Sequence, residues 1–253
     1  MIFRSRFAPV LPGLLFLLLW QLVVGDNERL KFLFASPVLI LQVAATELQQ
    51  MAIWMDCWIT LSEALLGLFF GTVLGTFLGI LLWSDRGIDR IVRPYIIVIG
   101  SIPVFALAPI MIVWFGTDLL SKAIMAGFAV FFVSLVQAYE GATIAAEHHI
   151  NFANSLRAAR HRVIRKIVIP GSLRWVVAGF RMNVGFALTG AFIGEFVSSE
   201  AGIGHYILKS SSLYDMPRVF LGLFLISTMA LLLNFIAKVM QRFHCVTAVN
   251  RGA

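Results

Sequence analysis

Positive charge is concentrated in one short stretch of a chain that is otherwise apolar. The segment NFANSLRAARHRVIRKIVIPGSL, residues 151–173, carries basic side chains within ten positions: Arg157, Arg160, Arg162, Arg165 and Lys166. Aliphatic and aromatic residues between them follow helical steps that place them on one face, namely Phe152, Leu156, Ala159, Val163 and Ile167. We expect an amphipathic helix that ends at Ile169, because Pro170 disfavours helical backbone in the residue before it.

A basic amphipathic helix between two spans has three interpretations. A basic amphipathic helix can lie on anionic lipid headgroups, form a solvated loop, or place its apolar stripe in a groove of a partner protein. As a membrane span the segment fails, because each mid-membrane basic residue would cost roughly 2.5–3.5 kcal/mol. The three binding interpretations remain open at this point.

The rest of the sequence lacks the residue patterns of an enzyme. Glu147, His148 and His149 are adjacent, but their order does not give the H-E-x-x-H spacing of a zinc site. Cys57 and Cys245 lie too far apart for a metal or disulfide framework. The chain contains no paired carboxylates, no G-x-S-x-G motif and no Gly-Lys dipeptide, hence no phosphate-binding loop of the G-x-x-x-x-G-K-[ST] kind. Any ATP must therefore be bound by another polypeptide.

Composition indicates an all-α polytopic membrane protein. The 253 residues are 60% hydrophobic and 13% charged, with a mean hydropathy of +0.90. Apolar runs reach the roughly 20 residues that a helix needs to cross a bilayer. We expect one transmembrane domain over residues 1–253, with spans at about 8–24, 58–83, 95–115, 120–138, 174–197 and 217–240. The intervening residues 139–173 then form a cytoplasmic loop.

The net charge of +7 follows the positive-inside rule and gives no indication of a nucleic-acid partner. With both termini in the cytoplasm, fourteen of the twenty basic residues lie on the inner side. These are Arg4, Arg6, Arg86, Arg90, Arg93, the six from Arg157 to Arg174, Lys238, Arg242 and Arg251. Lys122 is expected on the outer side.

The N-terminal apolar run is interpreted as a retained helix. LPGLLFLLLWQLVV follows Arg4 and Arg6 like a signal peptide, but no A-x-A-like cleavage site comes after it. The next segment, SPVLILQVAATELQQ, is expected to form a surface helix with Ser36 as N-cap and Pro37 at the first helical position.

Two of the predicted spans contain glycines or prolines that affect how the helix backbone packs or bends. Gly67, Gly71, Gly75 and Gly79 recur every fourth residue and form a bare ridge, which predicts close packing against another span or another subunit. Pro103 and Pro109 each remove an amide donor from the third predicted span. Backbone groups freed at membrane depth need protein or a water-filled cavity, so Ser101 and Pro103 are candidates for lining a transport path; tolerance of the prolines in a packed bundle is the alternative.

Few polar residues fall inside the spans. Asn183 and Thr189 in the fifth span either face a cavity or bond neighbouring helices. Among the acids, Glu63 and Glu195 alone approach membrane depth, which does not favour a proton-coupled secondary transporter. Six spans without a repeat also make half of a typical transporter. A membrane scaffold or such a half-transporter, uncoupled to an ATPase, is the alternative function.

The order of segments resembles a known family. ANSLRAARHRVIRKIVIPGSLRWVVAGFR is similar to the cytoplasmic EAA loop of permease subunits from bacterial ATP-binding-cassette (ABC) importers, with Ile169-Pro170 as its closing pair. FASPVLIL, TLSEALLGLFFGTVLG, SIPVFALAPIMIVWFG and IGEFVSSEAGIGHYI are similar, in order and spacing, to the branch for nitrate, sulfonates, taurine, bicarbonate and heterocyclic vitamin precursors. The resemblance covers roughly residues 28–243.

The resemblance implies a type I importer fold and a division of labour in the bacterial inner membrane. Two permease subunits, identical or different, would form the path for a small solute. A cytosolic ABC ATPase dimer would bind ATP and Mg²⁺, and an extracytoplasmic solute-binding protein would deliver the solute. Glu195, with Gly202 and Gly204, matches the outer end of span five, where the resemblance suggests a gate or a docking role.

The resemblance assigns coupling to the ATPase to the loop, and there the chain departs from the family pattern. The residues concerned are Asn151, Leu156, Arg157, Ala158, Ala159, Arg160, Val163, Ile167 and Pro170. Arg157 stands where the family has a glycine at a turn, and Asn151 stands where it has a glutamate. An arginine in the left-handed conformation costs on the order of 1 kcal/mol, so a single continuous helix is expected as one alternative and a strained Arg157 as the other.

Overall fold

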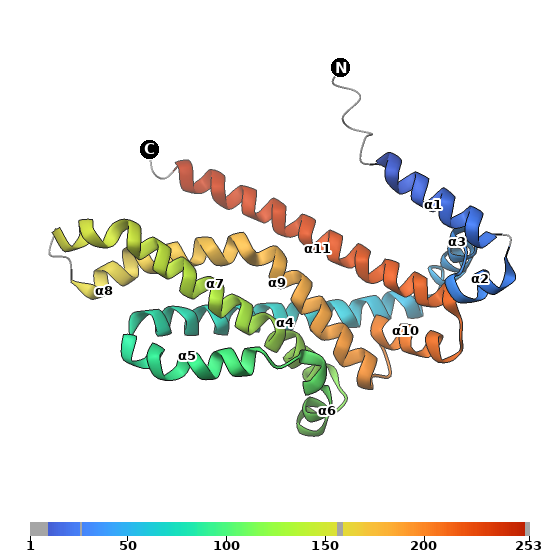
Figure 1. The fold of residues 1–253 in the computed structure, drawn as a ribbon, viewed down its shortest axis with the longest axis horizontal. Coiled ribbons are helices and arrows are strands. Elements are labelled where there is room, and N and C mark those ends of the chain that lie inside the picture. Colours follow the sequence, from blue (N-terminus) through green and yellow to red (C-terminus); the bar gives the residue numbers. More distant parts are fainter. Residues whose placement is uncertain (1–9, 26, 156–158, 251–253) are drawn as a thin grey trace, which may run out of the picture.

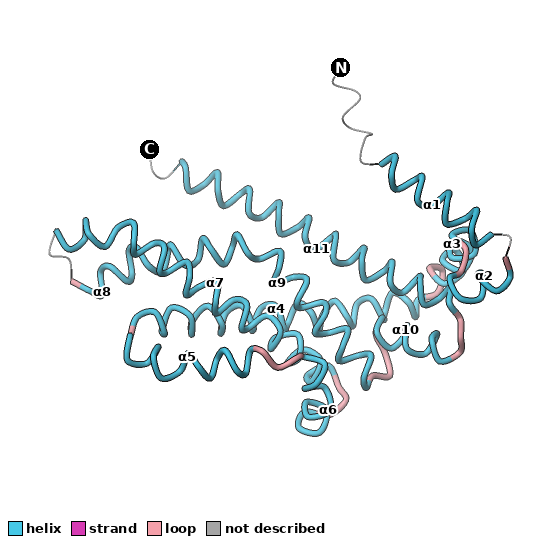
Figure 2. Tube along the Cα trace, in the orientation of Figure 1, coloured by secondary structure: helices cyan, strands magenta, loops and turns pink. Residues whose placement is uncertain are grey.

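The computed structural model describes residues 10–25, 27–155 and 159–250, and every regular element within these ranges is a helix. In chain order the helices are α1 (Val10–Gly25), α2 (Glu28–Phe34), α3 (Pro37–Glu47), α4 (Met51–Ser84), α5 (Arg86–Gly100), α6 (Val104–Phe115), α7 (Leu119–Ser155), α8 (Arg160–Val163), the π-helical turn η2 (Ile164–Val168), α9 (Ile169–Ser198), α10 (Ile203–Ser212) and α11 (Met216–Asn250). Short loops join them (Figure 2).

Four helical stretches are long and apolar enough to cross a bilayer: Met51–Ser84, Leu119–Glu147, His161–Ser198 and Met216–Val239. The count rises to six if two bent pairs, α2 with α3 and α5 with α6, each count as one span. The predicted all-helical membrane fold is therefore confirmed. The apolar part of α1, Leu11–Gly25, is shorter than these stretches.

The core is formed where α4, α7 and α9 pack together. Small side chains dominate their contact: Ala64, Ala126, Ala187 and Ala191 are each at most 1% exposed and belong to one cluster. Small residues let helix backbones approach closely, which is the main source of helix association in lipid. Figure 1 shows α8 and α10 at opposite ends of this bundle, and these are called below the α8 end and the α10 end.

Residues 95–115, predicted as one span, form parts of two helices joined at a sharp bend. The axes of Gly87–Gly100 and Val104–Phe115 differ by 94°. The break falls where Pro103 lacks an amide hydrogen for a helical bond and adopts extended backbone as the N-cap of α6. Pro109 lies inside α6 without ending it, so position and packing, rather than proline alone, decide where the chain turns.

The predicted helix end at Ile169 is wrong, since one helical stretch runs from His161 to Ser198 and continues past Pro170. The π-helical turn η2 directly precedes the proline, and the Ile169 amide donates to the Ile164 carbonyl. This wider turn relieves the clash between a proline ring and the carbonyl one turn back. Helix α7 likewise extends to Ser155, so much of the predicted loop 139–173 is regular helix.

The predicted cap of α3 is confirmed. Ser36 Oγ accepts a hydrogen bond from the Leu39 amide at 3.3 Å, and Pro37 occupies the first helical position. Helix α2 precedes α3 at a bend of 50°.

Candidate functional site

The four glycines of α4 lie against α7 in a fixed register. A Cβ atom at Gly71 would lie 2.5 Å from the carbonyl oxygen of Gly127 and 2.9 Å from Val130 Cβ. Gly67, Gly75 and Gly79 face the carbonyl oxygens of Ala123, Phe131 and Leu135 in the same way, so the contact repeats every four residues on both helices. This glycine seam brings Cα–H groups against carbonyl oxygens, a weak but recurrent stabilising contact between helices.

Asn183 bonds α9 to α7 at the middle of the bundle. Its side chain is fully buried, donates to Ser134 Oγ at 2.9 Å and accepts from Gln137 Nε2 at 3.3 Å. The other predicted polar residue of this helix, Thr189, is exposed, and its hydroxyl donates to the Gly185 carbonyl at 2.9 Å. The structure therefore separates the two residues: Asn183 points into the packed core and Thr189 points out of it.

Glu195 organises the α10 end. Its side chain is fully buried and accepts hydrogen bonds from the Thr60 hydroxyl and the Gly204 amide, both at 2.6 Å. Thr60 Oγ1 in turn accepts from the Ile203 amide at 2.9 Å. Gly202 has a φ of +100°, a conformation that glycine adopts without strain. One carboxylate thus fixes the first turn of α10 to both α4 and α9.

Two further ionisable residues are buried beside Glu195. Glu63 of α4 is 1% exposed, and Lys122 of α7 is 4% exposed and donates to the Thr117 carbonyl. Glu63 lies next to the Glu195 carboxyl group, and Lys122 is within electrostatic reach of both. Lys122 was expected on the outer side, and its burial beside two carboxyl groups places its ammonium next to groups that can carry the opposite charge.

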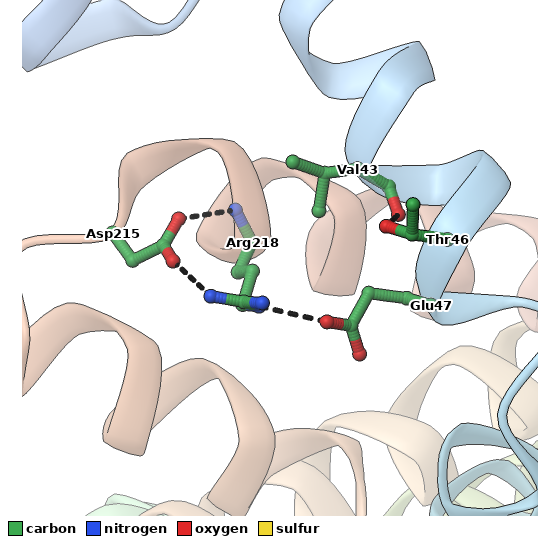
Figure 3. Close-up of polar contacts among 5 residues, drawn as sticks. All are labelled: Val43, Thr46, Glu47, Asp215 and Arg218. Carbon is green, nitrogen blue, oxygen red and sulfur yellow. Dashed lines mark hydrogen bonds and ion pairs between the residues drawn. The ribbon is translucent and has the colours of Figure 1, made fainter.

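A charged clamp ties α3 to the start of α11 (Figure 3). Arg218 Nε donates to Glu47 at 2.9 Å, and Arg218 Nη1 donates to Asp215 at 2.5 Å. Burial and the Glu47 carboxylate raise the pKa of the nearby Tyr206 hydroxyl, which therefore stays neutral. The clamp lines a cavity of about 340 Å³ together with polar residues of α4 and α10.

Ser101 and Pro103 form the break between α5 and α6. Both are exposed, and the Ser101 hydroxyl donates back to the Ile97 carbonyl at 2.6 Å. The same carbonyl also accepts from the Ser101 amide at 3.1 Å, so the hydroxyl adds a second hydrogen bond at the end of α5. The break lies near α7, because a Cβ atom at Gly100 would come within 2.9 Å of the Phe132 ring.

The described parts of the basic segment lie at the α8 end. Leu156, Arg157 and Ala158 lie outside the described residues, and so do the side chains of Asn151 and Arg160. Val163 and Ile167 are half-buried, and Val168 is fully buried. The basic side chains on the other side are exposed: Arg162, Arg165 and Lys166.

Two cavities flank α7 between the middle of the bundle and the α8 end. One has a volume of about 470 Å³ and lies against α5, where Tyr139 donates to Asp89 at 3.1 Å and Arg93 stacks over the Tyr139 ring. The other has a volume of about 620 Å³ and lies against α9. Val136 and Glu140 line both.

Sequence reasoning missed Thr60, Lys122 and the Arg218 clamp. Thr60 and Glu195 are 135 positions apart, and no periodicity within one helix indicates such a pair. A Thr or Lys near the end of an apolar run looks like an interfacial residue until the neighbouring helix is placed.

Comparison with known proteins identifies relatives that match most of the chain. Residues 67–244 match the family described as "Binding-protein-dependent transport system inner membrane component". A probable ABC transporter permease protein of Haemophilus influenzae is 28% identical over 227 residues, which cover 90% of this chain and 92% of that protein.

Several relatives have a solute in their names. The formylaminopyrimidine transport permease protein ThiX of Halalkalibacterium halodurans is 26% identical over 88% of this chain and 89% of its own length. The putative aliphatic sulfonates transport permease protein SsuC of Bacillus subtilis is 23% identical over 92% of this chain and 84% of its own.

The fold also matches a solved structure. A chain of the MetNI methionine ABC transporter, in an inward-facing conformation, has a TM-score of 0.67 at 18% identity and covers 76% of this chain and 95% of its own. At this identity the match supports the fold alone.

Proposed function

Because the chain belongs to the family of binding-protein-dependent transport system inner membrane components, we propose that it is one permease subunit of an ABC importer. Its helices form an integral membrane protein, and its relatives are permease components of ABC transporters. The match of residues 67–244 to the family is the observation that carries the proposal. ATP and Mg²⁺ are assigned to a cytosolic ATPase dimer, because the chain has no phosphate-binding loop.

The α8 end is proposed to face the cytoplasm and to receive the ATPase. Exposed basic residues at this end, such as Arg162 and Arg165, agree with the positive-inside rule. Val163 and Ile167 are half-buried and offer a short apolar edge for a partner groove. The continuous helix from His161 to Ser198 would carry a displacement at this edge into the membrane without a loop in between.

A second permease subunit is proposed to complete the path, and an extracytoplasmic solute-binding protein to dock at the α10 end. Ser101, Pro103 and Thr189 are exposed in the single chain and are proposed to line the path. Asn183 and Glu195 are fully buried, so they are proposed to position the helices that form it. The solute is proposed to belong to the classes named for relatives, a heterocyclic precursor or a sulfonate.

The test is co-purification of the tagged chain from its native membrane in mild detergent, followed by mass spectrometry. We expect an ATPase with a phosphate-binding loop in the complex. Val163→Asp and Leu156→Asp should each lose it, since a carboxylate on the apolar edge must be desolvated on docking. His161→Asp is the matched control, because His161 lies on the exposed side of the same short helix.

Recovery of the wild-type chain without an ATPase from several gentle extractions would refute the proposal and favour the scaffold or half-transporter. Retention of the ATPase by the Val163→Asp variant would leave the family assignment intact and remove this edge as the docking point. For the path, Thr189→Ala should change uptake of the native solute, whereas unchanged uptake would remove Thr189 from it.

A further inference from the structure

One side of α9 is open along the half of the bundle nearer the α8 end. Trp175, Met182 and Phe186 are 42%, 60% and 41% exposed and follow helical steps of seven and four, so they share one side. Thr189 continues this open side toward the α10 end. A Cβ atom at Gly185 would meet no atom within 4 Å.

Two charged residues lie exposed near the open side. Arg181 is exposed on α9, and Glu140 is exposed on the neighbouring part of α7. Both lie within stretches apolar enough to span a membrane. Neither forms an ion pair with another described residue. Charged side chains avoid hydrocarbon, so we expect the part of α9 and α7 that carries Arg181 and Glu140 to face water or protein.

The 620 Å³ cavity lies between this side of α9 and α7. Its volume falls within the range of about 300–1,000 Å³ typical of sites for small organic molecules. Phe132, Trp175 and Met182 form apolar walls, and Gln137 and Glu140 supply its polar groups. Gln137 Nε2 is held by Asn183, and its Oε1 accepts no hydrogen bond from the described part of the chain. The cavity thus has a largely apolar surface, with the exposed Glu140 carboxylate beside it and a buried, unsatisfied Gln137 Oε1 in its wall.

We propose that this cavity contacts the solute in the inner half of the path and that it selects a heteroaromatic organic molecule. A ring stacks on the Trp175 indole, while a ring N–H or amino group donates to the exposed Glu140 carboxylate. Nitrate, bicarbonate and taurine have no ring, so the apolar walls give them no favourable contact. Glu140 and Arg181 have opposite charges, so the open side as a whole does not select an anion. The inference rests on the proposed function.

The test uses the permease purified with its co-purifying ATPase and placed in lipid nanodiscs. The probes are riboflavin and 4-amino-2-methylpyrimidine as ring compounds, and taurine and nitrate as ringless anionic or zwitterionic solutes. We expect equilibrium binding of a ring compound and no competition by taurine or nitrate. Trp175→Ala should weaken this binding about ten-fold, whereas Trp175→Phe, which keeps a ring, should weaken it by less than about three-fold.

The control is Phe235→Ala, which removes an aromatic ring that is 65% exposed on α11 and lies outside this cavity. It should bind the ring compound as the wild type does, and all variants should elute as intact complexes with unchanged thermal stability. The inference is overturned if neither ring compound binds, or if Trp175→Ala and Phe235→Ala bind equally well. An ATPase in the preparation shows that the proposed function survives such a failure, whereas its absence means that both fail.

Discussion

Substitution of Gly71 by alanine tests the glycine seam most directly. The new Cβ atom would lie 2.5 Å from the Gly127 carbonyl oxygen and 2.9 Å from Val130 Cβ. Neither neighbour is the flexible end of a side chain, so the two helices must separate. Gly127, across the same contact, is the matched control, because a Cβ atom there has its closest neighbour at 3.5 Å, an ordinary contact distance.

The expected difference follows from two opposing effects. Both substitutions gain up to about 1 kcal/mol of helix propensity. Gly71→Ala alone carries the cost of overpacking, typically about 1–3 kcal/mol. The two variants should therefore differ by that cost. For a chain of this length, each kcal/mol corresponds to about 2–4 °C, so their apparent Tm values should differ by about 2–12 °C.

The assay is thermal unfolding in one detergent at one heating rate, followed by size-exclusion chromatography, because unfolding of such a protein is a kinetic measurement. Gly71→Ala should have the lower Tm, and Gly127→Ala should equal or exceed the wild type. If Gly71→Ala were as stable as Gly127→Ala, the close approach of α4 and α7 would be refuted.

Three further substitutions test the polar contacts. Glu195→Ala leaves the buried Gly204 amide without its acceptor, at about 1–3 kcal/mol, so limited proteolysis should cut the segment before α10 faster than in the wild type; equal rates would contradict the anchoring role. Asn183→Leu keeps the volume but removes the bonds between α9 and α7, so the Tm should fall by several degrees, and an unchanged Tm would mean that apolar packing alone holds this contact. Arg218→Ala should cost no more than about 1 kcal/mol, because the side chain is 44% exposed, and the loss should shrink in high salt; a loss independent of salt would argue against the ionic clamp.

Much of the fold could be predicted from composition, since apolar runs long enough to span a bilayer have few alternatives to helix. The seam was visible as a spacing of four in Gly67–Gly79, because that spacing alone makes a bare helix face. The sequence could not say that the ridge meets α7 of the same chain, since small residues suit any close neighbour.

The sequence-based expectations failed where packing between helices overrides the local preference of a residue. Pro103 and Pro170 carry the same local signal, yet the chain turns sharply at the first and passes the second through a π-helical turn. Proline removes one donor and adds one steric clash, and neighbouring helices decide whether the chain bends or widens. The burial of Lys122 could not be predicted for a related reason: the carboxyl groups beside it come from α4 and α9.

The glycine seam also limits how this bundle can move. Its contacts repeat every four residues on both partners, which is close to one helical turn, or about 5.4 Å. A slide of a fraction of a turn would set carbonyl oxygens against side chains at all four positions, whereas a slide of a whole turn would restore three of them. The glycine seam therefore allows only discrete relative positions of α4 and α7. Small movements during a transport cycle are then expected at other places, such as the α5–α6 break and the π-helical turn.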